Sequence, residues 1–137
     1  MRATATTIVK KPVDHVWSVL ADHEGMANWG PGIKVTLDKQ GSPTPGGVGA
    51  VRRIDAPGPM PAIVEEVTVF EPGSRLGYKA VSGVPFKNYH GDVVLTPVAD
   101  GTKIDYSVSL DLPLVGVLPA TAIAQTLMRL LARAARG

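Results

Sequence analysis

Between residues 33 and 112 this sequence repeats one pattern six times: a run of alternating apolar and polar residues, then a short segment rich in glycine or proline. The runs cover residues 33–39, 48–55, 62–71, 74–82, 87–96 and 102–112. Alternation of this kind predicts strands with two different faces, and the segments between the runs are typical of tight connections. The pattern therefore predicts consecutive antiparallel strands.

The residues before this series predict one more strand and two short helices. Residues 2–10 are β-branched and alternating, which predicts a strand. Pro12 suits a first helical turn, and it precedes four apolar residues at helical spacing: Val13, Val16, Trp17 and Leu20. We expect Gly25 to end or break this helix, and a short second helix to lead to Trp29.

Residues 119–136 carry the clearest helical pattern. An apolar stripe is formed by Ile123, Leu127, Leu130, Leu131 and Ala134. Opposite it lie Gln125, Arg129, Arg133 and Arg136, which we expect to be a solvated face; the alternative is contact with anionic lipid or a partner. These elements together predict an α+β fold: a curved antiparallel sheet of about seven strands wrapped around a long C-terminal helix, with two short helices after the first strand.

Composition narrows the class of protein. The chain has 137 residues, 45% apolar and 19% charged, so we expect one globular domain over residues 1–137. The sequence has no apolar run near the roughly 18 residues that span a membrane, and no secretory signal is evident, so we expect no stable membrane insertion and a cytoplasmic location. The absence of cysteine from the sequence excludes disulfides, thiolate metal sites and cysteine nucleophiles. A net charge of +2 without a basic stripe argues against nucleic acid as a partner.

Four stretches, in order along the chain, carry a family resemblance. They are KKPVDHVWSVLAD, MANWGPGIKV, IVEEVTVFEPGSRLGYKAVSG and GDVVLTPVADGTKIDYSV. Together they resemble the START-like helix-grip superfamily (SRPBCC), particularly its polyketide cyclase/dehydrase and lipid-transport branch. The resemblance implies a helix-grip fold that holds an apolar small molecule between the sheet and the terminal helix. Members of this superfamily include carriers, cyclases or dehydratases, and regulators.

The segment NYHGDVVLT poses the question of which side chains face inward. In an extended strand Tyr89, Gly91, Val93 and Leu95 share the more apolar face, whereas His90 and Asp92 share the other. We therefore expect Tyr89 inside and His90 at the surface. By the same alternation, the next strand should bury Ile104, Tyr106, Val108, Leu110 and Leu112.

Two charged residues are expected on inward faces. Glu65 shares a face with Ile63, Val67 and Val69, which would place a partly desolvated carboxylate in or near the cavity, suited to general acid or base chemistry. The simpler interpretation is a Glu65 paired with an arginine. Arg52 lies on a face with Val48, Ala50 and Ile54 and is the expected partner or a ligand anchor, although Arg53 could replace it.

Aromatic residues complete the candidate site. Tyr78, Tyr89 and Tyr106 are expected to point into one space and to orient a ligand carbonyl or phenol, or else to be ordinary core. Trp17 is expected in the core, and the resemblance implies that Trp29 is a wall or gate residue. The full set of expected ligand-binding residues is Trp29, Arg52, Glu65, Tyr78, Tyr89, Tyr106, Ile123 and Leu127.

Other kinds of site are not expected. His15, His23 and His90 are the chain's histidines, and no two are spaced as a helical zinc pair, so we expect no metal and no cofactor. The segment PTPGGVGA lacks the Lys-Ser/Thr of a phosphate loop and precedes a strand rather than a helix. The serines near the last strands lack a nucleophile-elbow motif.

Three functions remain. The first is binding, or transport, of a hydrophobic small molecule such as a lipid or polyketide, by a monomer or homodimer. The second is a polyketide aromatase/cyclase or dehydratase that acts on a poly-β-ketone chain, with Glu65 or Tyr89 moving protons and Arg52 stabilising an enolate. We rank this enzymatic function below ligand binding, because the sequence offers no convincing inward histidine or carboxylate pair. The third is a partner protein that acts through protein contacts.

Overall fold

The computed structural model describes residues 2–59, 61–84, 87–111 and 117–137. Its elements in chain order are β1 (Arg2–Val9), α1 (Val13–Ala21), the 3-10 helix η1 (Glu24–Asn28), β2 (Lys34–Lys39), β3 (Val51–Asp55), β4 (Ile63–Glu71), β5 (Arg75–Ser82), β6 (Lys87–Val98), β7 (Gly101–Asp111) and α2 (Val117–Arg136). The predicted order of elements is confirmed. Leu112, expected at the end of the last strand, lies outside the described residues.

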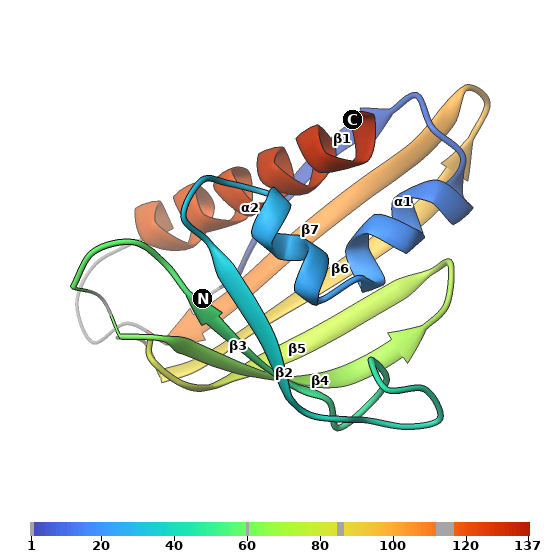
Figure 1. Cartoon of the computed structure of the whole chain (residues 1–137). Coiled ribbons are helices and arrows are strands. Elements are labelled where there is room, and N and C mark those ends of the chain that lie inside the picture. The colour runs from blue at the N-terminus through green and yellow to red at the C-terminus, as the bar shows by residue number, and fades with distance from the viewer. Residues whose placement is uncertain (1, 60, 85–86, 112–116) are drawn as a thin grey trace.

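The strands form one antiparallel sheet with the order β1-β7-β6-β5-β4-β3-β2. Each strand from β2 to β7 pairs with its neighbour in sequence, and β1 closes the series by pairing with β7. The sheet is curved, with α2 lying lengthwise over its β1–β7 side and α1 and η1 beside the C-terminal half of α2 (Figure 1). His15 fixes α1 to α2, because its Nε2 lies 2.8 Å from the carbonyl oxygen of Ala135.

The face that α2 buries differs from the predicted stripe. Its buried residues are mostly alanines, with one methionine and one leucine: Ala120, Ala124, Met128, Leu131, Ala132 and Ala135. Ile123, Leu127, Leu130 and Ala134 are only partly buried along the flank of this face. Alanine lets the helix backbone approach β1 and β7 closely, so the larger side chains are turned away from the tightest contact. Of the predicted stripe only Leu131 belongs to the buried face, so the observed face is rotated relative to the prediction.

Two element boundaries and one bulge also correct the sequence analysis. α1 ends at Ala21, and Gly25 lies inside η1 rather than ending α1. β3 begins at Val51, and Val48 is 47% exposed in a loop bridge with Ser42. A bulge between Val67 and Val69 interrupts the alternation in β4.

The bulge changes which β4 residue packs inward. Beyond it, Phe70 rather than Val69 packs on the core, against Trp17 at a ring-centroid separation of 5.2 Å. An extra residue in one strand shifts every later side chain to the opposite face. Trp17 is only partly buried, although it contacts the core as expected. In the described parts of the chain, no helix combines the length and apolar character needed to cross a membrane.

We predict that Ala124→Leu destabilises the protein by about 1–3 kcal/mol, because the added side chain has no space between α2 and the sheet. Ala122→Leu on the exposed side of the same helix is the matched control and should change stability by less than about 0.5 kcal/mol. Urea unfolding measures both. Equal losses in the two variants would show that helix propensity, rather than close packing, sets the stability.

Candidate functional site

A cavity of about 140 Å³ lies between the sheet and α2. It is lined by Met26, Trp29, Ile33, Arg52, Ile54, Ile63, Glu65, Tyr78, Tyr89, Tyr106, Leu127 and Leu130. Its residues come from η1 and the turn that follows it, from the five strands β3 to β7, and from α2. Most of the lining is apolar or aromatic, and the polar atoms gather on the strands.

Strand alternation and one glycine place the tyrosines. Tyr78 on β5 lies directly opposite Gly91 on β6, and a Cβ atom at Gly91 would collide with the Tyr78 ring. The glycine therefore gives the ring the space to lie across β6. Tyr89 and Tyr106 follow the predicted inward faces of β6 and β7, and all three tyrosines are buried.

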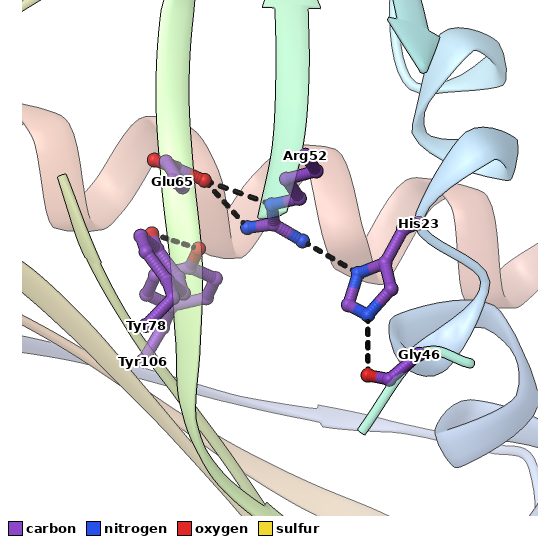
Figure 2. Close-up of polar contacts among 6 residues, drawn as sticks. All are labelled: His23, Gly46, Arg52, Glu65, Tyr78 and Tyr106. Atoms are coloured by element: carbon purple, nitrogen blue, oxygen red, sulfur yellow. Dashed lines mark hydrogen bonds and ion pairs between the residues drawn. The ribbon is translucent and has the colours of Figure 1, made fainter. Parts of the chain in front are cut away.

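Arg52 and Glu65 form a buried ion pair on neighbouring strands. They are directly opposite each other in the β3–β4 ladder, and their side chains are 3% and 6% exposed. Arg52 donates from Nε at 2.9 Å and from Nη2 at 2.7 Å, both to Oε1 of Glu65 (Figure 2). Burial is the largest single influence and lowers the pKa of Arg52, but Glu65, together with the nearby Tyr78 and Tyr106, raises it, and the net pKa lies above its usual value.

His23 supports the other side of the guanidinium. Its Nδ1 lies 3.1 Å from Nη1 of Arg52, and its Nε2 lies 2.9 Å from the carbonyl oxygen of Gly46 (Figure 2). Because arginine can only donate, Nδ1 must accept and Nε2–H must donate, which is one neutral tautomer. Burial, then the nearby Arg52 charge, lowers the pKa of His23, so the neutral form is favoured.

A pair of tyrosine hydroxyls lies beside the ion pair. The hydroxyls of Tyr78 and Tyr106 are 2.6 Å apart, and the guanidinium carbon of Arg52 lies 4.8 Å from the Tyr78 ring centroid. Burial raises the pKa of Tyr89 to about 12, and it raises the pKa values of Tyr78 and Tyr106 well above their usual range. The phenols therefore stay protonated and act as hydrogen-bond donors and acceptors at neutral pH.

The residues expected in the site mostly meet at this cavity. Trp29, Arg52, Glu65, Tyr78, Tyr89, Tyr106 and Leu127 line it. Ile123 does not: with Ala122, Thr126 and Leu127 it lines a separate surface hollow. Arg53 points to the exposed side of β3, which leaves Arg52 as the inward arginine. Their roles in ligand binding remain predictions.

The question of which β6 side chains face inward has a clear answer. His90 is exposed, with its Nδ1 3.0 Å from the carbonyl oxygen of Asn88, and Asp92 accepts from Nε of Arg75 at 2.7 Å on the outer face. The two residues therefore share the outer face of the sheet, as predicted, and make no catalytic pair with each other.

His23 is the main polar residue that the sequence analysis missed. It was considered only as a metal ligand, and no inward histidine was expected, yet it is 4% exposed and contacts Arg52. It lies between α1 and η1, where no helical or strand period specifies a direction. Ile54, Ile63 and Leu130 were expected on apolar faces but were not named as ligand-binding residues, and Met26 and Ile33 were not expected in the site at all. Among the described residues no group of three or more histidine, aspartate or glutamate side chains is arranged to hold a metal ion.

A second hollow, of about 470 Å³, lies outside the cavity at the C-terminal end of α2. It is lined by Ser18, Val19, Asp22, Gly25, Asn28, Trp29, Arg133, Ala134 and Gly137. Trp29 belongs to the walls of both spaces and is itself buried. Trp29 therefore lies between the outer hollow and the inner cavity.

Comparison with known proteins agrees with this architecture. A family model described as polyketide cyclase / dehydrase and lipid transport matches residues 1–137. Among curated proteins, no sequence matches this chain.

Solved structures show the same fold. Ara h 8.0201 has a TM-score of 0.79 at 14% identity, and the match covers 100% of this chain and 95% of that one. A START superfamily protein from Mycobacterium smegmatis has a TM-score of 0.74 at 17% identity, and the match covers 99% of this chain and 94% of that one. A protein from Nitrosospira multiformis has a TM-score of 0.72 at 21% identity, and the match covers 99% of this chain and 94% of that one. Identities this low show the fold alone, and that fold is the expected helix-grip fold.

We predict that Arg52→Met costs about 3–5 kcal/mol of stability, because it leaves the Glu65 carboxylate buried without its partner. The double variant Arg52→Met/Glu65→Leu should lose much less, since both charges are gone. Arg75→Met, which breaks the exposed pair with Asp92, is the control and should cost less than about 1 kcal/mol. Chemical denaturation measures all three variants, and a double variant that loses as much stability as Arg52→Met alone, or more, would contradict the coupling.

We predict that the protein loses stability as the pH rises above about 10. The three tyrosines of the chain are the three in the site, and their folded pKa values lie above the unfolded value of about 10. Their contribution is complete below that pH and is lost as pH rises through the folded values. Because the chain has no other tyrosine, the ultraviolet absorbance of tyrosinate reports on these three residues alone. Ionisation of all three near pH 10 in the folded protein would contradict the prediction.

Proposed function

We propose that this chain, which belongs to the polyketide cyclase/dehydrase and lipid-transport family, binds a small hydrophobic molecule. We further propose that this molecule is about the size of one aromatic ring and carries a hydrogen-bond acceptor. The family and the helix-grip fold are those of a hydrophobic-ligand-binding domain. The observation that carries the finer proposal is the cavity: a small apolar space that ends on Arg52 and the tyrosine pair.

The size of the cavity limits the ligand. Drug-sized ligands occupy about 300–1,000 Å³, whereas an apolar cavity of about 150 Å³ is known to take benzene. At about 140 Å³, this cavity matches a single substituted ring. A long acyl chain or an extended poly-β-ketone would need the walls to move apart.

The polar end of the cavity favours an acceptor. Arg52 uses three of its five N–H groups on Glu65 and His23, which leaves donors beside the protonated tyrosines. Arg52 and Glu65 cancel in charge, so the site carries no net charge to attract a strong anion. A carbonyl or phenol oxygen at this end satisfies the donors, while the ring buries apolar surface at about 25 cal/mol per Å².

We predict that acetophenone binds about tenfold more tightly than ethylbenzene, which has a similar shape but no acceptor. One hydrogen bond to a charged donor contributes about 1.5 kcal/mol or more, which corresponds to that ratio. Isothermal titration calorimetry with each compound measures the difference. Equal affinities would contradict an acceptor-reading site.

Two variants test whether binding occurs in this cavity. Leu130→Phe enlarges a lining side chain and should weaken acetophenone binding, whereas Val81→Phe on the exposed face of β5 should leave it unchanged. Native mass spectrometry of the freshly purified protein, compared with its denatured mass, tests for a natural ligand that is retained through purification. Fragmenting an added mass that disappears on denaturation would identify the chemical class of that ligand. Acetophenone binding that is unaffected by Leu130→Phe would place the ligand elsewhere.

The second candidate function is an aldol-type cyclase, supported by the arrangement around Glu65. Both contacts from Arg52 reach Oε1, and the second carboxylate oxygen points away from Arg52 in Figure 2. That oxygen would take an α-proton from a ketone while Arg52 stabilises the enolate. The enolate carbon would then attack a second carbonyl of the same substrate, the resulting alkoxide would take the proton back from Glu65, and the β-hydroxyketone would lose water. Undiminished turnover of a diketone surrogate by the Glu65→Gln and Tyr89→Phe variants would exclude Glu65 and Tyr89 as the groups that move protons.

A further inference from the structure

The buried position of His23 is not required by the cavity, because His23 does not line it. It connects three separate segments: its own position after α1, Arg52 on β3, and the loop that contains Gly46. The contact with the loop is close, since a Cβ atom on Gly46 would lie 3.2 Å from Cδ2 of the imidazole. A glycine at 46 therefore allows the loop to pack directly on the ring.

The contacts of His23 depend on its protonation state. At present Nδ1 accepts from Nη1 of Arg52, and Nε2–H donates to the Gly46 carbonyl oxygen. A proton added to Nδ1 would remove the acceptor and would place a second positive charge about 3 Å from the guanidinium. The Gly46 contact would survive, because Nε2 carries its proton in both states.

We propose that His23 is a positioning residue, and that protonation of its Nδ1 displaces the Arg52 guanidinium and thereby weakens ligand binding. The ligand part of this proposal rests on the proposed function, whereas the displacement of Arg52 does not. Arg52 is the residue through which His23 acts: three of its N–H groups are fixed by Glu65 and His23, and losing one fixed contact frees the fork to rotate away from the cavity.

The charges that face His23 agree with this direction. Arg52 on β3 opposes protonation, whereas Asp22, adjacent in sequence at the end of α1, and the Gly46 carbonyl oxygen in the loop favour it. Glu65 lies beyond Arg52 and pairs with it. Burial is the largest influence, and the balance lowers the pKa of His23 from its usual 6.5. Because the unfolded chain takes up this proton more readily, the free energy of unfolding falls as the pH drops below about 6.5.

The first test needs no ligand. Nitrogen NMR of the imidazole distinguishes the two neutral tautomers, and a pH titration follows His23 together with the Nε–H signal of Arg52. We expect the Nε2–H tautomer at neutral pH, and an Arg52 signal that shifts along the His23 titration curve. An Nδ1–H tautomer, or an Arg52 signal indifferent to His23 protonation, would overturn the proposal even if acetophenone failed to bind.

The second test measures acetophenone affinity against pH. In the wild-type protein we expect a fall of about tenfold that follows the His23 titration curve, equivalent to about 1.4 kcal/mol. His23→Leu should bind weakly at every pH. His23→Asn places a non-titrating amide oxygen near Nδ1, so its affinity should exceed that of His23→Leu and should not follow the His23 curve.

His90→Gln, an exposed histidine variant, controls for general histidine effects and should retain the wild-type profile. A wild-type pH profile in His23→Leu, measured on a variant that urea unfolding shows to be folded, would overturn the role of His23. Loss of acetophenone binding at all pH values in the wild type would instead count against the proposed function, and the NMR titration would still decide the positioning role.

Discussion

The buried charge of Arg52 is the constraint around which the inner half of this sheet is organised. A guanidinium inside a protein is costly unless it is paired and its donors are satisfied. The sheet register supplies Glu65 directly opposite, the segment after α1 supplies His23, and β5 supplies the face of the Tyr78 ring. Each partner comes from a different element, so the position of one side chain links η1, the Gly46 loop and three strands.

Alternation predicted much of this arrangement because it is a local property of extended backbone. The inward directions of Arg52, Glu65, Tyr78, Tyr89 and Tyr106 each follow from the period of two, and a family resemblance supplied the curvature that brings their strands together. His23 escaped prediction because it lies between two helices, where neighbouring residues do not specify a direction. Only the tertiary fold brings its imidazole to Arg52, 29 positions further along the chain.

Two other departures have local causes that the sequence does not display. The bulge in β4 moves Phe70 to the core, and no glycine or proline marks it at residues 67–69. The predicted stripe on α2 was built on Ile123, Leu127, Leu130, Leu131 and Ala134, whereas the small side chains of the neighbouring face decide how closely the helix approaches the sheet. Packing of α2 through alanine leaves Leu127 and Leu130 on the flank, where they become cavity walls.

The fold and the cavity constrain function at different levels. A helix-grip fold permits many ligands, since fold alone does not determine function. The volume of the cavity and the donors at its end are properties of this chain's own side chains. A paired Arg52–Glu65 is an uncommon way to line an apolar pocket, because two aliphatic residues would give comparable or better stability. In the proposed binding function, the pair would supply discrimination: a ligand without an acceptor would leave desolvated donors unmatched and would bind more weakly than one that carries an acceptor.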